Sequence, residues 1–122
     1  MKLSEAMRLG AMATEQCFEM LYDPITGATC AVGSVYSAIG KLGIGYKYAD
    51  LRLEFPILAS VDATACPDCG DATHIRTSCA LIPHLNDVHL WTREQIADYV
   101  ATIEAQQDAK PEPLEVAVCV PK

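Results

Sequence analysis

Basic side chains are scarce in this chain of 122 residues, which has nine Lys and Arg against sixteen Asp and Glu and a net charge of −7. Proteins that bind nucleic acid or anionic membranes take much of their affinity from clustered Lys and Arg, so we expect neither activity here. No apolar run approaches the roughly 18 residues of a membrane-spanning helix. Glu5 and Arg8 interrupt the N-terminal apolar stretch, so no signal peptide is predicted. These absences predict a cytoplasmic protein.

The chain also lacks the short motifs of common catalytic sites. It has no GxSxG nucleophile elbow, no Walker phosphate loop and no HExxH zinc-protease helix. The zinc-deaminase pattern is missing too, because no Glu stands next to a His. We therefore expect a protein that is not an enzyme.

Length and hydrophobic content predict one small domain. The chain is 51% hydrophobic, which suffices for a single modest core. We predict a mainly α-helical domain over residues 1–107, with a short β-hairpin added in an α+β alternative. Beyond Gln107, Pro111 and Pro113 end any helix. Residues 108–122 are therefore predicted to form an extended tail or an edge strand.

Apolar residues at helical spacing predict helices over 3–21, 29–39 and 92–106, together with short helical turns on either side of Pro56. Ser4 and Thr29 are the expected N-caps of the first two helices, and Gly40 the stop of the second. Gly10 should weaken the middle of the first helix.

The helix over 92–106 has the clearest start signal. Thr92 and Gln95 form a capping box, in which each side chain accepts a hydrogen bond from the other residue's backbone N–H. Trp91 precedes the cap, and Ile96 stands where it can complete a hydrophobic staple. This staple explains Trp91 without a binding role.

Six cysteines in a cytoplasmic protein are expected to be metal ligands or buried thiols rather than disulfides. Cys30 lies on a stripe of small residues, with Gly33, Ser37 and Ala38, that would let another segment pack closely. We interpret Cys30 as a buried thiol rather than a reactive residue or a ligand.

The segment Cys66-Pro-Asp-Cys69-Gly is the strongest chemical signal in the sequence. Two thiolates at this spacing can bind one tetrahedral metal ion, and the following Gly70 lets the backbone turn around the sulfur atoms. A redox pair is disfavoured because Gly70, Asp68 and Asp71 do not suit a helix N-terminus that would activate a thiol.

Two ligand sets complete a four-coordinate site within a zinc-finger-like segment over residues 66–89. The first adds His84 and His89 to the two cysteines, in a spacing that resembles Cys2His2 zinc fingers. The second adds His74 and Cys79 instead. A mixed set with Cys79 and His84, or no metal at all, also stays open.

The second set resembles the zinc knuckle of retroviral nucleocapsid proteins in its spacing. It departs from that family at Pro67, where an aromatic base-stacking residue is usual, and at Asp68 and Asp71, where a nucleic-acid binder would carry positive charge. These departures put an RNA-binding role in doubt.

Over most of its length, the chain resembles a family of small uncharacterised phage and bacterial proteins. Its shared motifs match Leu3–Ala11, Cys30–Gly33 and, most specifically, the HLNDVHLWTREQIADYV segment over His84–Val100. The resemblance implies that His84, Asn86, Asp87, His89 and Trp91 act as a unit, and so favours His84 and His89 as ligands of Zn²⁺. Asp87 would then orient an imidazole by accepting its free N–H, or else lie on the helix surface.

These observations predict a small acidic, zinc-stabilised accessory protein of the phage type, which acts by binding an unidentified protein partner and modulates a host factor. The alternative is a nucleic-acid-binding zinc finger or zinc knuckle. Against it, Arg76 and Arg93 are the only basic residues over 66–104, and Glu94, Asp98 and Glu104 would repel phosphate.

Overall fold

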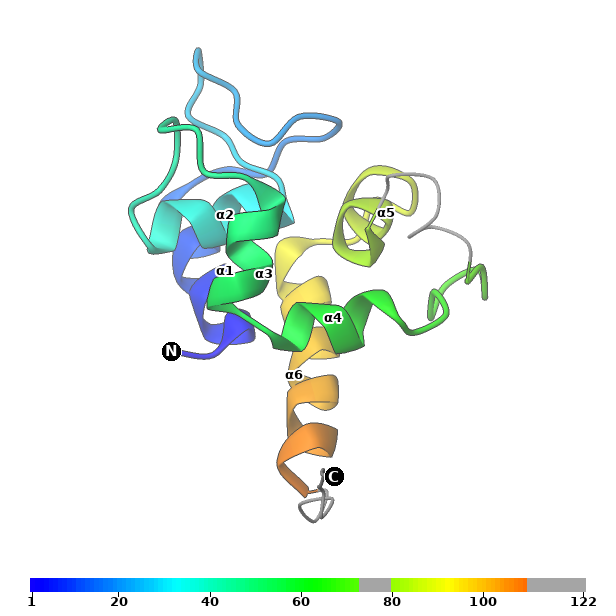
Figure 1. Cartoon of the computed structure of the whole chain (residues 1–122). Coiled ribbons are helices and arrows are strands. Elements are labelled where there is room, and N and C mark those ends of the chain that lie inside the picture. Colours follow the sequence, from blue (N-terminus) through cyan, green and yellow to red (C-terminus); the bar gives the residue numbers. More distant parts are fainter. Residues whose placement is uncertain (73–79, 110–122) are drawn as a thin grey trace.

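The computed structural model describes residues 1–72 and 80–109 of the chain. Within these ranges it contains six helices (Figure 1): α1 (Leu3–Ala13), α2 (Ala31–Ala38), α3 (Tyr48–Glu54), α4 (Ile57–Asp62), α5 (Leu81–Asp87) and α6 (Arg93–Ala109). The prediction of a mainly α-helical fold is confirmed. In the described ranges β-structure is limited to two isolated bridges, which join Thr29 to Gln16 and to Tyr22, so the predicted hairpin is not found there.

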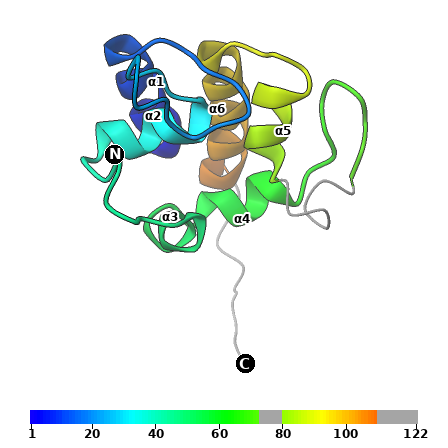
Figure 2. The same cartoon turned by 90° about the horizontal axis from the view of Figure 1, so that it is seen from above.

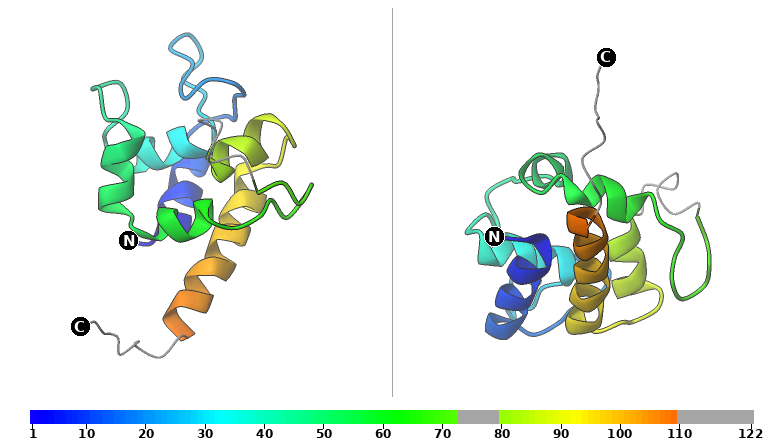
Figure 3. Two further views of the ribbon diagram at one scale, coloured as in Figure 1. Left: turned by 45° about the vertical axis from the view of Figure 1, so that its right-hand side comes forward. Right: turned by 90° about the horizontal axis from the view of Figure 1, so that it is seen from below.

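The longest helix, α6, lies at the centre of the fold. Seen from above, α1 and α2 lie on one side of α6, α5 lies on the other, and α4 lies along a third side with α3 next to it (Figure 2). Figure 3 shows the same order from two further sides. None of the described helices is long and apolar enough to cross a membrane.

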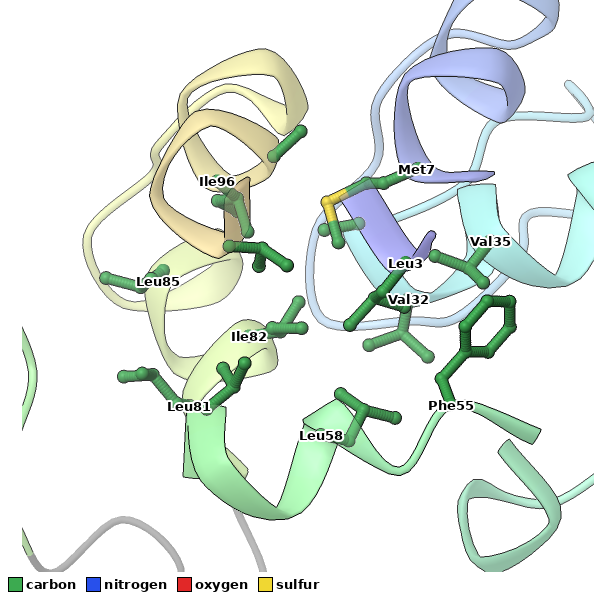
Figure 4. Packing of buried hydrophobic residues seen from close by; sticks show 14 of the residues in the cluster. Leu3, Met7, Val32, Val35, Phe55, Leu58, Leu81, Ile82, Leu85 and Ile96 are labelled. Carbon is green, nitrogen blue, oxygen red and sulfur yellow. The ribbon is translucent and has the colours of Figure 1, made fainter. Parts of the chain in front are cut away.

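One hydrophobic core joins all six helices. Buried aliphatic and aromatic side chains from each helix meet there (Figure 4), among them Leu3, Val35, Leu51, Leu58, Ile82 and Ile96. Full burial of one such side chain contributes about 1.5–3 kcal/mol relative to leaving it exposed. This core holds α5, and with it the histidines of the candidate site, against α2, α4 and α6.

Two glycines permit close packing, Gly10 between α1 and α2 and Gly33 between α2 and the backbone at Leu21. A Cβ built on Gly10 would lie 1.8 Å from the backbone oxygen of Ser34 on α2, and one built on Gly33 would lie 2.1 Å from that of Leu21. The predicted small-residue stripe on α2 therefore does permit a close approach at Gly33. Gly10 is predicted to lower the stability of α1, but the close contact between α1 and α2 requires a glycine at this position.

Two predicted boundaries of the first helix are wrong. Ser4 lies inside α1, whose N-cap is Lys2, and the helix ends at Ala13 rather than at residue 21. The early end has a tertiary cause. The backbone of residues 15–17 pairs with Thr29, and Arg93 from α6 binds the terminal carbonyl groups of α1.

Other local predictions hold with small shifts. Cys30, rather than Thr29, is the N-cap of α2, and Gly40 follows its end with a φ of 73°. Pro56 separates α3 from α4 as expected. The Thr92–Gln95 capping box is present with both hydrogen bonds. The helix that it starts continues to Ala109, beyond the predicted end at 106, and residues 110–122 lie outside the described residues.

Candidate metal centre

A tight turn over Cys66–Asp71 positions the two cysteine sulfur atoms. The backbone N–H of Gly70 donates to the carbonyl of Cys66 over 2.8 Å, and that of Cys66 donates to the carbonyl of Asp71 over 2.9 Å. Gly70 adopts a φ of 77°, which only glycine accommodates at little cost. The Cys66 sulfur accepts the N–H groups of Asp68 at 3.4 Å and Cys69 at 3.5 Å. Both N–H groups are thereby directed at the Cys66 sulfur atom.

The two histidines come from α5 and from the turn that follows it. His84 lies in the helix, which carries Pro83 in its first turn, where a missing N–H has no cost. After the helix, the chain reverses through Leu90, whose φ is 57°, and the N–H of Trp91 donates to the Leu85 carbonyl over 3.0 Å. The reversal places the His89 ring edge-on to the His84 ring, with 4.7 Å between centroids.

The turn and the histidines meet at one point. One ligand atom from each of Cys66, Cys69, His84 and His89 lies within 4.8 Å of all the others. The His84 Nε2 atom is 3.5 Å from the Cys69 sulfur and 3.1 Å from the His89 Nε2 atom. Metal–ligand bonds of about 2.3 Å to sulfur and 2.0–2.1 Å to nitrogen imply tetrahedral edges of about 3.3–3.8 Å. The four ligand atoms are therefore close enough to hold one tetrahedral metal ion once the longest separations, of up to 4.8 Å, contract.

The centre lies at the edge of the core rather than deep inside it. Cys66 and His84 are buried, His89 is half-buried and Cys69 is exposed. The Asp71 backbone N–H lowers the pKa of the Cys69 thiol, but desolvation and the neighbouring Cys66 thiol outweigh it, so this pKa lies above its ordinary value. A bound cation would reverse this balance, because it stabilises the thiolate directly.

Asp68 is the carboxylate closest to the histidine ligands among the described contacts. Its Oδ2 atom lies 3.6 Å from Nδ1 of His89 and accepts a hydrogen bond of 2.8 Å from Nε1 of Trp91. Asp87 faces the other way: its Oδ1 atom accepts from the backbone N–H of Glu19 at 2.9 Å and from the Asn86 amide at 2.7 Å. Of the two alternatives for Asp87, an orienting carboxylate or a charge on the helix surface, the contacts described above show no imidazole bound to it, whereas Asp68 lies near the His89 ring.

The first predicted ligand set is the one that the structure brings together. The alternative ligands His74 and Cys79 lie outside the described residues, so the zinc-knuckle set stays a prediction. Cys30 is buried and outside the cluster. Its sulfur accepts from the Gly33 N–H at the start of α2, and burial raises the pKa of its thiol to about 11. The interpretation of Cys30 as a buried thiol is confirmed.

Asn86 connects the candidate metal centre to the start of α2 and to residues 16–17, a role that the spacing of residues in the sequence does not predict. It is fully buried, and its side-chain oxygen accepts from the Ala31 N–H, the first residue of α2, and from the Gln16 amide. Its own amide donates to the Cys17 carbonyl over 3.1 Å. In the sequence, Asn86 is singled out through the resemblance, which groups it with Asp87 and the two histidines.

No family model, curated protein or solved structure matches this chain.

Proposed function

We propose that this chain is a zinc-stabilised helical protein, in which Cys66, Cys69, His84 and His89 hold one structural Zn²⁺, and that it acts by binding a protein partner. The observation that carries the proposal is the convergence of four good ligand atoms within 4.8 Å. Four protein ligands close a tetrahedral site, whereas catalytic zinc keeps one position for water. A closed site supports a structural role.

The chemistry of the donor set supports zinc over other metals. Two thiolates and two imidazoles in a tetrahedral arrangement are typical zinc ligands, whereas Mg²⁺ and Ca²⁺ prefer oxygen. In this position the ion would join the turn over Cys66–Asp71 to α5 and its following turn. Such a cross-link compensates for the small core of a short chain.

Partner binding is supported by what surrounds the centre. In the described residues four side chains are available to fill a tetrahedral site, which leaves no position for a reacting water, and the net charge of −7 opposes nucleic acid. The resemblance to small phage and bacterial proteins extends this proposal to an accessory role in which the partner is a host factor. The nucleic-acid-binding alternative has no basic surface to support it in the described residues.

Metal analysis of the untagged chain, purified without chelator, tests the zinc proposal. We expect one zinc per chain, lost from His84→Ala together with a large drop in the melting temperature, because metal binding and folding are coupled in small sites. His74→Ala is the matched control and should keep both zinc and stability. The reverse result would select the zinc-knuckle set, and a chain without zinc or iron would end the proposal.

A further inference from the structure

Exposed apolar side chains gather on two segments beside the metal centre. Residues 16–21 carry Phe18, Met20 and Leu21, which are 43%, 46% and 38% exposed, and residues 87–91 carry Val88 and Leu90, which are 60% and 63% exposed. We name this region the acidic–apolar surface. Clustered exposed hydrophobic residues on a small protein mark an interaction site more often than scattered ones do.

Hydrogen bonds hold the two segments against each other. The Gln16 amide donates to the Trp91 carbonyl over 2.8 Å, and the Glu19 N–H donates to the Asp87 carboxylate over 2.9 Å. The surface is therefore built in advance of binding, which lowers the entropy cost of association.

Backbone strain coincides with this surface. Glu19 and Leu90, with φ of 63° and 57°, are the non-glycine residues with positive φ in the described part of the chain. Each belongs to one of the two segments. A left-handed conformation is unfavourable for a side chain such as leucine and persists where the surrounding structure imposes it. Here it turns Leu90 outward, where it contributes little to the core.

The formally charged side chains on the two segments are the carboxylates Glu19 and Asp87, while Arg52 on α3 is close enough for its charge to act on Tyr48. The sequence holds no Lys or Arg from residue 9 to residue 40, whereas Glu15, Glu19 and Asp23 lie in that span. Asp87 adds a fourth carboxylate. The nearest cation in the sequence, Arg93, is buried with its guanidinium on backbone carbonyl groups, so it does not neutralise this surface.

A groove opens beside the surface. It has a volume of about 390 Å³, and its lining includes Met20, Leu21, Val32 and Tyr36 together with Glu19 and Asp87. The groove can accept large apolar side chains of a ligand, while the two carboxylates meet its cationic groups.

We infer that the acidic–apolar surface binds a basic amphipathic helix of a partner protein. A helix of this kind offers both an apolar stripe for Met20, Leu21 and Leu90 and Lys or Arg side chains for the carboxylates. Nucleic acid and anionic membranes offer the wrong charge. A second copy would bring two acidic surfaces together in a two-fold interface. This inference rests on the proposed partner-binding function and names the surface and the partner chemistry.

The full chain, purified without chelator, is titrated into a fluorescently labelled amphipathic helix made of Leu and Lys, and binding is followed by anisotropy. A Leu/Glu helix of the same pattern and a Leu/Lys peptide with its pattern scrambled are the control probes. We expect the Leu/Lys helix alone to bind, with affinity that falls as salt rises. Leu90→Ser and Met20→Ser should each weaken binding by about tenfold or more. Both side chains are exposed, so neither variant should lose its fold.

Leu53→Ser is the matched control, because Leu53 is 81% exposed on α3 and outside the surface. It should bind as the parent does. Equal loss in Leu53→Ser, binding of the Leu/Glu helix or the scrambled peptide, or no binding at all would overturn the inference. So would a dimer that Leu90→Ser dissociates, or preferential binding of a labelled DNA duplex. If zinc is absent but the Leu/Lys helix binds as described, the zinc proposal fails and this inference stands.

Discussion

Glu104, near the end of α6, accepts hydrogen bonds from both the backbone N–H and the hydroxyl group of Ser4, in the first turn of α1. At the start of α6, Arg93 donates to the carbonyl groups of Ala11 and Thr14 at the opposite end of α1. The N-terminus of a helix carries partial positive charge and the C-terminus partial negative charge. Each buried ion therefore stabilises the end of α1 that it contacts, and α6 caps α1 at both ends.

Removing either cap should destabilise the fold. Arg93→Met leaves two carbonyl groups of α1 without a donor and should lower the free energy of unfolding by about 3 kcal/mol. Glu104→Gln keeps the shape but loses the charge, and should cost about 1–2 kcal/mol. Urea unfolding measures both. Glu94→Gln, at an exposed neighbouring site, should stay within about 0.5 kcal/mol, and an equal loss there would argue against specific capping.

The caps of α1 show why some elements could be predicted from sequence and others could not. The start of α6 is encoded locally by Thr92 and Gln95, and the break at Pro56 by the missing N–H, so both were predictable. The end of α1 depends on Arg93, which is distant in sequence. Helical spacing alone therefore predicts a helix that continues to residue 21, whereas α1 ends at Ala13.

We expect Gly10→Ala to lower the stability of the fold, which is the opposite of what helix propensity predicts. On propensity alone alanine would stabilise α1 by about 1 kcal/mol. The added Cβ would instead lie 1.8 Å from the backbone oxygen of Ser34. Backbone cannot yield as a flexible side chain can, so we expect a net loss of about 1–3 kcal/mol. Thermal melts of Gly10→Ala and of Leu9→Ala, at a half-exposed neighbour on α1, check this. A stabilised Gly10→Ala would disprove the close contact.

Ionisation of Cys30 should weaken the fold at high pH. Burial raises the pKa of this thiol from its ordinary value of 9.0 to about 11. Between these values the unfolded chain has released the proton and the folded chain has not. Stability contributed by the neutral thiol is therefore complete below pH 9 and is lost as the pH rises through 11.

Cys30→Ser isolates this contribution. Serine can still accept the Gly33 N–H as the N-cap of α2, but it does not ionise in this range. The parent should lose more stability than Cys30→Ser between pH 9 and pH 11, as measured by urea unfolding at each pH. Parallel curves for the two proteins would contradict the buried-thiol assignment.

The candidate ligands were predictable because Cys66 and Cys69 share one turn and His84 and His89 share one short segment. The hydrogen bonds and ion pairs around these ligands could not be predicted from the sequence. Asp87 is close to both histidines in sequence, but α5 directs it toward Glu19. Asp68 is far from His89 in sequence, and the fold of the cysteine turn brings it near. Sequence proximity to a ligand is thus a poor guide to which carboxylate orients it.

Asp68→Asn and Asp87→Asn separate these two carboxylates by their effect on zinc. Asp68 lies 3.6 Å from Nδ1 of His89 and is fixed by the Trp91 indole N–H, so its charge favours the ring orientation that directs Nε2 toward the metal. Loss of such a partner typically weakens metal binding by about 10–100-fold. We expect that loss in Asp68→Asn, from competition with a chromophoric chelator.

Asp87→Asn removes a carboxylate from the same region without touching an imidazole. It should bind zinc within about twofold of the parent, well short of the loss that an orienting partner causes. Any effect should appear as lower stability, since Asp87 accepts the Glu19 N–H. Equal zinc affinity in both variants would show that neither carboxylate orients a ligand. If Asp87→Asn alone lost zinc affinity, the metal-bound centre would differ from the geometry described above, with His89 turned toward α5.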